Sequence, residues 1–250
     1  MSFQVTGAAY DRFMGRYSRL LAPQLADLAG VSAGQRVLDV GSGPGALTAE
    51  LVARVGAAAV VAVDPSAPFV DALRERLPDV EAVRASAEAL PFGDGVFDAA
   101  LAQLVVHFMA DPVAGLREMA RVTRSGGVVA ACVWDHAGER SPVAVFWRAA
   151  RELDPGVHDE SGLAGAREGA LPDLLLEAGL ERVVVGELEA AFTHASFEEW
   201  WEPFTLGVGP AGQYVAGLDE CSRTALSERC RALLPGAPRA VAWAAAGIVA

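Results

Sequence analysis

The stretch VLDVGSGPG, residues Val37–Gly45, decides the fold of this chain. An apolar strand runs into three glycines at alternate positions, Gly41, Gly43 and Gly45, and a helix is predicted to begin at Ala46. Glycine permits positive φ angles and lets a ligand approach the backbone closely. The helix start behind the turn offers free N–H groups and a partial positive charge. The pattern therefore predicts a loop that holds an anionic or zwitterionic part of a ligand.

The glycine spacing, GxGxG, differs from the GxGxxG fingerprint of dinucleotide-binding folds. Leu47 occupies the position of the third glycine of that fingerprint, and its side chain crowds the close approach that a pyrophosphate needs. Asp64 ends the next apolar run, AVVAVD, about 20 residues after the loop, where an acidic side chain accepts hydrogen bonds from ribose hydroxyls. The alternative is that Asp64 caps a helix that has Pro65 at its first position.

Short apolar runs alternate with helix-like stretches through the first two-thirds of the chain. We predict strands at 36–40, 59–63, 80–84, 96–103 and 127–134, and helices at 17–28, 46–55, 67–77 and 113–123. Beyond them we predict helices at 143–153, 171–178 and 222–234, strands at 182–192 and 239–250, and an aromatic segment at 197–204. Strands that alternate with helices predict crossover connections. The fold class is α/β: a Rossmann-like seven-stranded, mostly parallel sheet with helices on both faces and helical insertions in the C-terminal part.

The composition excludes several classes of function. The chain has 250 residues with 32 acidic and 20 basic side chains, a net charge of −12, and it contains neither Lys nor Asn. This charge disfavours a nucleic acid partner and an anionic membrane surface, since both need basic side chains. The absence of Lys excludes Schiff-base chemistry. Three scattered cysteines predict no disulfide framework, and the N-terminus lacks a signal-peptide pattern, so we expect a cytoplasmic protein.

Four segments, taken in their order and spacing, carry a resemblance to a known family. They are VLDVGSGPG, AVDPS (62–66), SAEALPFGDGVFD (86–98) and LREMARVTRSGGVVAACVW (116–134). Together they resemble the class I S-adenosylmethionine (SAM)-dependent methyltransferases, and most of all the small-molecule type related to the ubiquinone and menaquinone biosynthesis methyltransferases. The resemblance runs from about Tyr10 to Trp134 and weakens beyond. It implies SAM as cofactor and S-adenosylhomocysteine as product.

The resemblance also implies the cofactor-binding residues, which are Tyr10, Arg16, Tyr17, Asp39, Gly41, Gly43, Gly45, Asp64, Pro65, Ser66, Ser86, Ala87, Glu88 and Gln103. The glycines would line the methionine and ribose portions, and Asp39 would act electrostatically on the amino group. Asp64 would bind the ribose hydroxyls, with Pro65 and Ser66 beside the adenine.

Three other parts of this set carry alternatives. Ser86 stands where the family usually has Asp, so its contact with adenine would fall to the hydroxyl and to the backbone of Ala87 and Glu88. Gln103 would face the methionine end, or is a strand-end glutamine with satisfied hydrogen bonds. In the N-terminal helix Arg16 would grip the SAM carboxylate bidentately, and Tyr10, Phe13 and Tyr17 would cover the sulfonium. Alternatively, this helix packs its aromatic side chains on the core.

The substrate side depends on histidine and aromatic residues. His107 follows the fourth predicted strand and is the candidate general base, against a structural role for a lone histidine. His136, His158 and His194 rank below it. The candidate substrate-binding residues are aromatic, and the alternative for them is packing of helices onto the sheet. They are Trp147, Trp200, Trp201 and Phe204.

These observations predict one methyltransferase domain over residues 1–250. A lid helix spans about 8–30, the SAM-binding core about 31–134, and the substrate-side insertions and last strands about 135–250. The expected activity is SAM-dependent methylation of a small hydrophobic or aromatic molecule, by a monomer or homodimer and without a metal. Two alternatives are a SAM-binding protein without methyl-transfer activity and an NAD(P)-dependent oxidoreductase. The GxGxG spacing and the lack of Lys count against the second.

Overall fold

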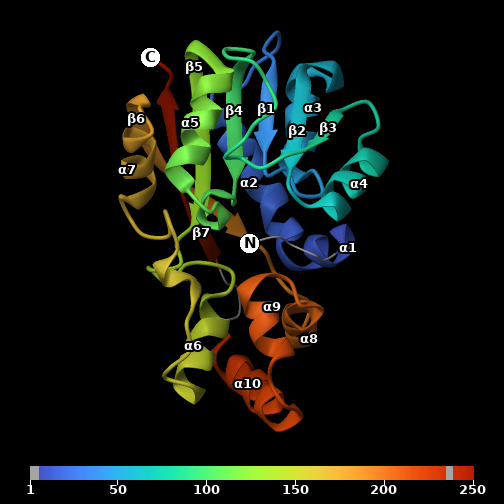
Figure 1. Cartoon of the computed structure of the whole chain (residues 1–250). Helices are drawn as coiled ribbons and strands as arrows, with labels where there is room; N and C mark the ends of the chain where they lie inside the picture. Colours follow the sequence, from blue (N-terminus) through green and yellow to red (C-terminus); the bar gives the residue numbers. More distant parts are fainter. Residues whose placement is uncertain (1–5, 235–238) are drawn as a thin grey trace.

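Seven strands form one sheet in the order β3-β2-β1-β4-β5-β7-β6 (Figure 1). The strands are β1 Val37–Val40, β2 Val60–Asp64, β3 Glu81–Arg84, β4 Phe97–Gln103, β5 Thr123–Trp134, β6 Glu181–Ala191 and β7 Arg239–Ile248. Strands β1 to β5 pair in parallel, and β7 runs antiparallel between β5 and β6. The predicted seven-stranded, mostly parallel sheet is confirmed.

The computed structural model describes residues 6–234 and 239–250. The predicted domain limits also include residues 1–5 and 235–238, which lie outside the described residues. No helix among the described residues is both long enough and apolar enough to span a membrane.

Helices cover both faces of the sheet, because neighbouring strand residues point to opposite sides. On one face, Val37 packs with helices α2 Arg16–Leu28, α3 Ala46–Val55 and α4 Ala67–Arg76. On the other face, Leu38 packs with helices α5 Pro112–Val122 and α7 Ala170–Glu177. Strand β1 is buried along its whole length, so the predicted apolar run lies at the centre of the sheet.

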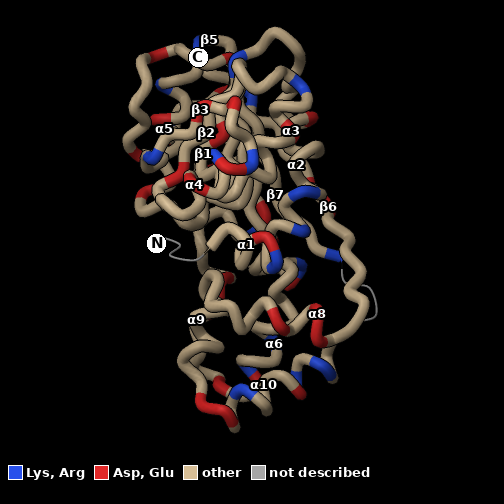
Figure 2. Tube along the Cα trace, turned by 90° about the vertical axis from the view of Figure 1, so that its right-hand side faces the viewer, with Lys and Arg blue, Asp and Glu red and all other residues tan. Residues whose placement is uncertain are grey.

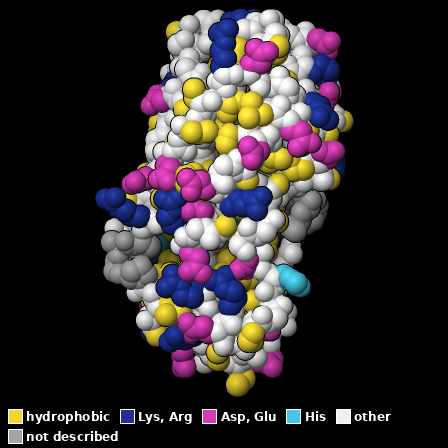
Figure 3. Space-filling view, turned by 90° about the vertical axis from the view of Figure 1, so that its left-hand side faces the viewer, with side chains coloured by type: hydrophobic (Ala, Val, Ile, Leu, Met, Phe, Trp, Pro, Cys, Tyr) yellow, Lys and Arg dark blue, Asp and Glu magenta, His cyan; other side chains and the backbone are white. Residues whose placement is uncertain are grey.

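Strand β6 forms one edge of the sheet and leaves apolar side chains in solvent. Val184 and Val185 are 53% and 65% exposed, and Leu176 of α7 is 54% exposed. Figure 3 shows this face of the molecule, on which hydrophobic side chains are interspersed with charged ones.

A group of helices extends beyond the carboxyl ends of the parallel strands (Figure 1). These helices are α6 Ala144–Leu153, α8 Phe197–Trp201, α9 Gly209–Ala216 and α10 Glu220–Leu233. They share a separate hydrophobic core around Phe146, which stacks on Phe204 at 4.7 Å between ring centroids. Acidic and basic positions lie side by side along them in Figure 2, and Arg231 of α10 pairs with Glu198 of α8 at 2.7 Å. These helices form the predicted helical insertions. Helix α9 was not predicted from the sequence.

The N-terminal segment changes its helical type as it approaches the sheet. Helix α1 Gly7–Tyr10 continues into a π-helical turn, Asp11–Gly15, and then into α2. A π-helical turn rotates the side chains that follow it relative to those before it, and such turns are frequent at functional sites. Tyr10 and Tyr17 therefore face different parts of the molecule, although the sequence predicts them on one lid helix.

Candidate functional site

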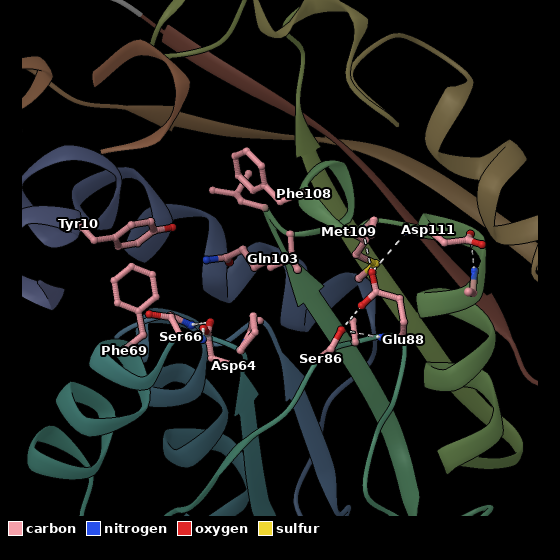
Figure 4. Close-up of a pocket in the computed structure, with 18 residues that line it drawn as sticks. Tyr10, Asp64, Ser66, Phe69, Ser86, Glu88, Gln103, Phe108, Met109 and Asp111 are labelled. Carbon is pink, nitrogen blue, oxygen red and sulfur yellow. Dashed lines mark hydrogen bonds between the residues drawn. The ribbon is translucent and has the colours of Figure 1, made fainter. Parts of the chain in front are cut away.

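A cavity of about 630 Å³ opens at the carboxyl ends of β1, β2 and β4, where ligands bind in open α/β sheets. Ten of the fourteen predicted cofactor-binding residues line it, namely Tyr10, Gly41, Gly43, Asp64, Pro65, Ser66, Ser86, Ala87, Glu88 and Gln103. Figure 4 shows Asp64 and Ser66 at the base of this cavity, Tyr10 and Phe69 on one side, and Glu88, Met109 and Asp111 on the other.

The glycine loop forms part of the cavity wall through its backbone. Gly41 has φ of 69°, and a Cβ at this position would lie 2.4 Å from a methyl group of Val105. The backbone N–H groups of Gly41 and Ser42 donate to the carbonyl of Val63, at 2.8 and 3.0 Å. Gly45 lies at the start of α3, outside the lining residues. The loop is thus fixed between two strands, and glycine at 41 is required for both its conformation and the space.

Asp64 joins the end of β2 to the glycine loop. Its carboxylate accepts the backbone N–H of Gly43 at 2.9 Å and that of Ser66 at 2.8 Å. Burial raises the pKa of this carboxyl, while the two backbone hydrogen bonds oppose the rise. The alternative role as a helix cap is wrong, because α4 begins at Ala67 with Ser66 in the N-cap position and Pro65 outside the helix. A carboxylate has about four lone-pair sites, so acceptor capacity remains toward the cavity.

Asp39 lies behind the loop rather than in the cavity wall. Its side chain is 1% exposed and accepts the Thr48 hydroxyl at 2.6 Å through Oδ2, while Oδ1 has no hydrogen-bond partner among the described residues. Burial raises the pKa of Asp39 to about 7. A group with this pKa is about half protonated at pH 7, so its full negative charge develops only above that pH. The electrostatic role expected of Asp39 stays a prediction.

Glu88 connects the residues of the opposite wall of the larger cavity through hydrogen bonds. Its carboxylate accepts the Ser86 hydroxyl and the backbone N–H of Ala110 at 2.8 Å. The pKa of Glu88 is lowered: burial opposes the fall, and the hydrogen bond from Ser86 is the largest contribution that favours it. Ser86 therefore places a carboxylate at this wall through Glu88, although it carries none itself.

Gln103 ties the end of β4 to the N-terminal helix. Its side-chain amide donates to the carbonyl of Ser18 at 3.0 Å, and its oxygen Oε1 is buried without a partner among the described residues. Tyr10 packs edge-to-face on Phe69, with ring centroids 5.3 Å apart, and burial raises its pKa to about 12. Gln103 and Tyr10 thus both line the larger cavity, as the resemblance implies for cofactor-binding residues.

The structure places Arg16 and Tyr17 away from this cavity. The Tyr17 hydroxyl lies 2.9 Å from Nε2 of His194, and a guanidinium nitrogen of Arg16 lies 3.2 Å from Nδ1 of the same ring. Arg16 also contacts Glu199 at 3.4 Å. Tyr17 fits the alternative prediction, in which this helix packs its aromatic side chains on the core, because its ring contacts Trp134 edge-to-face.

The histidine and the aromatic residues predicted on the substrate side lie elsewhere. His107 is buried at a second, smaller cavity of about 30 Å³. Trp200 and Phe204 lie in the core of the helical group, 4.8 Å apart between ring centroids, with Trp201 packed against them. Trp147 also lies in that core, and its indole N–H donates to Glu160 at 2.7 Å.

Eight further residues line the larger cavity, and sequence reasoning did not single them out. They are Phe69, Leu104, Val105, Phe108, Met109, Ala110, Asp111 and Ala114. Most belong to the segment between β4 and α5, which includes a 3₁₀ turn at Val106–Phe108. This segment follows the carboxyl end of a parallel strand, where ligands bind in open α/β sheets. Its place in the sequence could therefore have identified it as part of the cavity wall. No cluster of His, Cys, Asp or Glu suited to a metal ion occurs among the described residues.

Most of the strands and loops that line the larger cavity belong to a segment that is similar to known proteins. Residues 38–131 match a family model described as a methyltransferase domain. The match covers less than half of the chain. An uncharacterized methyltransferase of Mycobacterium tuberculosis is 39% identical over 140 residues, which are 56% of this chain and 54% of the relative. A demethylmenaquinone methyltransferase of Mycobacterium sp. is 44% identical over 117 residues, 47% of this chain and 49% of the relative. The chain thus matches about half the length of these relatives.

Solved structures resemble this chain beyond the segment 38–131. A methyltransferase solved in complex with the Trm112 methyltransferase activator of Haloferax volcanii has a TM-score of 0.61 and 19% identity, and the match covers 99% of both chains. This likeness concerns the fold alone. The predicted resemblance to Rossmann-like methyltransferases, with menaquinone biosynthesis enzymes among the relatives, is confirmed.

Proposed function

We propose that this chain is a SAM-dependent methyltransferase that acts on a small hydrophobic or aromatic molecule. The observation that carries the proposal is the position of Asp64, whose carboxylate binds two backbone N–H groups at the base of the larger cavity. An acid at the end of the second strand, beside a glycine loop, is the arrangement that binds a ribose. The match of residues 38–131 to a methyltransferase domain selects SAM among ribose-containing ligands.

The lining residues suit the three parts of SAM. Asp64 would accept the ribose hydroxyls, and the wall formed by Ser86 and Glu88 would face the adenine. Gln103 and the glycine loop would meet the methionine end, with Asp39 acting through space on its ammonium group. All of these residues line the larger cavity except Asp39, which lies behind the glycine loop.

Bound SAM would supply a methyl group activated by a positively charged sulfur. The chain would contribute orientation, because in-line displacement needs the acceptor atom aligned behind the methyl carbon. Tyr10 and Phe69 form an aromatic wall that excludes water from one side of the cavity. We further propose a cytoplasmic monomer or homodimer that needs no metal and binds neither nucleic acid nor membranes.

Ligand-induced stabilisation tests the proposal. Thermal unfolding would be recorded with SAM, S-adenosylhomocysteine and NADH, each in excess. A ligand at 100 times its dissociation constant adds about 2.7 kcal/mol to the free energy of unfolding. We expect both SAM species to stabilise the chain and NADH to have no effect. Stabilisation by NADH alone would refute the proposal in favour of an oxidoreductase.

Methyl transfer itself needs a second measurement. Incorporation of labelled methyl from SAM would be followed over a panel of quinols, phenols and other aromatic acceptors. We expect turnover with at least one of them. Stabilisation by SAM without turnover of any member would support a SAM-binding protein that lacks transferase activity.

A further inference from the structure

The smaller cavity adjoins the larger one through a shared wall. Tyr10, Leu104 and Phe108 line both cavities. The volume of the smaller cavity, about 30 Å³, is close to the space that one water molecule occupies in the liquid. Leu104 adopts φ of 61°, which is uncommon for a residue other than glycine and is found where function holds the backbone in place. In Figure 4, Phe108 and Tyr10 lie on the side of the larger cavity away from Asp64.

Buried polar atoms without partners gather at this smaller cavity. Among the described residues, seven buried side-chain nitrogen or oxygen atoms lack a hydrogen-bond partner. Four of the seven belong to residues that line this cavity: Nδ1 of His107, both ring nitrogens of His136, and Nε1 of Trp134. Buried polar groups in folded proteins are nearly always paired, so this concentration calls for an explanation. A polar ligand group in the cavity supplies one.

The two histidines are neutral near pH 7. Burial, and the proximity of His136, lower the pKa of His107 well below its usual value. Burial lowers the pKa of His136 to about 4, and the opposing influence of Asp159 and Asp135 is smaller. Their ring centroids lie 5.9 Å apart. Each neutral imidazole presents one N–H donor and one acceptor nitrogen.

This donor and acceptor pattern selects the chemistry of the ligand group. A hydroxyl both donates and accepts, so one hydroxyl satisfies an acceptor nitrogen and a donor N–H together. An ammonium group offers donors alone and would bring a charge into a buried site. The remaining lining, which includes Phe13, Met14 and Val208, is apolar, and a cavity of about 30 Å³ admits a hydroxyl group while the aromatic body of the ligand stays in the larger cavity. Glu160 also lines the cavity, and its carboxyl already accepts the Trp147 indole N–H at 2.7 Å.

We propose that the smaller cavity receives the hydroxyl group of the methyl acceptor, a neutral hydroxylated aromatic molecule, and that His107 and His136 are its hydrogen-bond partners. The proposal rests on the proposed function. It places this hydroxyl beyond the wall of Tyr10, Leu104 and Phe108, so the atom that receives the methyl group belongs to another part of the acceptor, inside the larger cavity. The two neutral imidazoles hold and orient the acceptor through this hydroxyl.

Binding of matched aromatic probes tests this assignment. The dissociation constants of 2-naphthol, naphthalene and 2-(aminomethyl)naphthalene would be measured with the full chain saturated with S-adenosylhomocysteine. We expect 2-naphthol to bind at least about tenfold more tightly than naphthalene, because a site with unpaired polar groups rejects an analogue that lacks the hydroxyl. Equal binding of 2-naphthol and naphthalene, or tightest binding of the amine, overturns the proposal.

A substitution at His136 supplies the second readout. His136→Phe keeps a ring and removes two unpaired buried nitrogens, so we expect unchanged or higher thermal stability together with loss of the preference for 2-naphthol. His158→Phe is the matched control, because His158 is exposed and outside the cavity, and it should keep the preference. A His136→Phe chain that retains the preference contradicts the assignment.

The two proposals fail in different ways. If S-adenosylhomocysteine does not stabilise the chain, the proposed function fails. If it stabilises the chain and the naphthol preference is absent, the hydroxyl site alone fails.

Discussion

The carboxylate of Asp64 accepts the backbone N–H of Gly43 at 2.9 Å, across 21 positions of sequence. This hydrogen bond joins the end of β2 to the loop after β1. The second oxygen accepts the N–H of Ser66 at 2.8 Å, so one side chain holds both segments at the base of the larger cavity. The residue proposed to bind the ribose also fixes the backbone around it.

Asp64→Asn is expected to weaken both ligand binding and stability. An asparagine side chain has one acceptor oxygen, so the N–H of Gly43 or of Ser66 would lose its partner. A buried donor left unpaired costs about 1–3 kcal/mol, which urea unfolding would measure. The dissociation constant of S-adenosylhomocysteine, measured by calorimetry, should rise at least about tenfold. The control is Asp71→Asn on the exposed side of α4, which should alter neither quantity; unchanged affinity in Asp64→Asn would refute the ribose assignment.

Gly41→Ala tests the close contact between the glycine loop and the segment after β4. An alanine here meets Val105 at 2.4 Å and must adopt φ of 69°. Gly30 has a similar φ of 64° and open space around it, so Gly30→Ala carries the conformational penalty alone. We expect Gly41→Ala to lose about 1–3 kcal/mol more in urea unfolding than Gly30→Ala. Equal losses would show that Val105 moves aside without cost.

Asp39 should make stability fall as the pH rises through 7. Burial raises the pKa of this carboxyl to about 7 in the folded chain, against 3.8 for an unperturbed aspartate. The folded state therefore binds the proton more tightly, and this stabilisation is complete below about pH 4 and lost above pH 7. Asp39→Asn removes the titration, so the mutant should gain stability over the wild type as the pH rises from 5 to 8.

Glu160 titrates in the same range, since burial raises its pKa to about 7, and the difference between mutant and wild type isolates Asp39. Urea unfolding at several pH values would measure that difference. A constant difference from pH 5 to 8 would contradict the shifted pKa of Asp39.

Local sequence signals predicted the strand, loop and helix around Gly43 because these features depend on neighbours in the chain. The apolar run before the loop, the glycine spacing and the acid at Asp64 each act within one βα unit. Ten predicted residues consequently line one cavity. The same signals could not predict Val105 or Phe108, because their position depends on how the segment after β4 packs against the loop and the N-terminal helix.

The positions of the two tyrosines in the N-terminal segment could not be predicted from local sequence patterns. Tyr10 and Tyr17 are seven positions apart, a spacing that places them on one face of a regular α-helix. The π-helical turn Asp11–Gly15 lies between them and alters that relation. Tyr10 lines the larger cavity, whereas Tyr17 contacts His194. His194 comes from a segment whose packing no local pattern specifies.

The contact of Tyr17 and Arg16 with His194 predicts acid sensitivity of the N-terminal segment. A guanidinium only donates, so Nδ1 of His194 accepts from Arg16 and Nε2–H donates to the Tyr17 hydroxyl. Burial and the neighbouring Arg16 lower the pKa of His194, against a smaller influence of Glu199. The folded state therefore favours the neutral ring, and its contribution to stability is present above about pH 6.5 and declines as the pH falls below that value.

His194→Phe keeps a ring beside Phe192 and removes both hydrogen bonds. We expect a loss of about 1 kcal/mol at pH 8 and a smaller loss at pH 5, because the wild type has given up part of this contribution there. His107 and His136 remain in both chains, so their titration cancels in the difference. His158→Phe, at an exposed position, should match the wild type at both pH values. If the loss in His194→Phe were the same at pH 8 and pH 5, His194 would not be the group whose protonation releases the N-terminal segment.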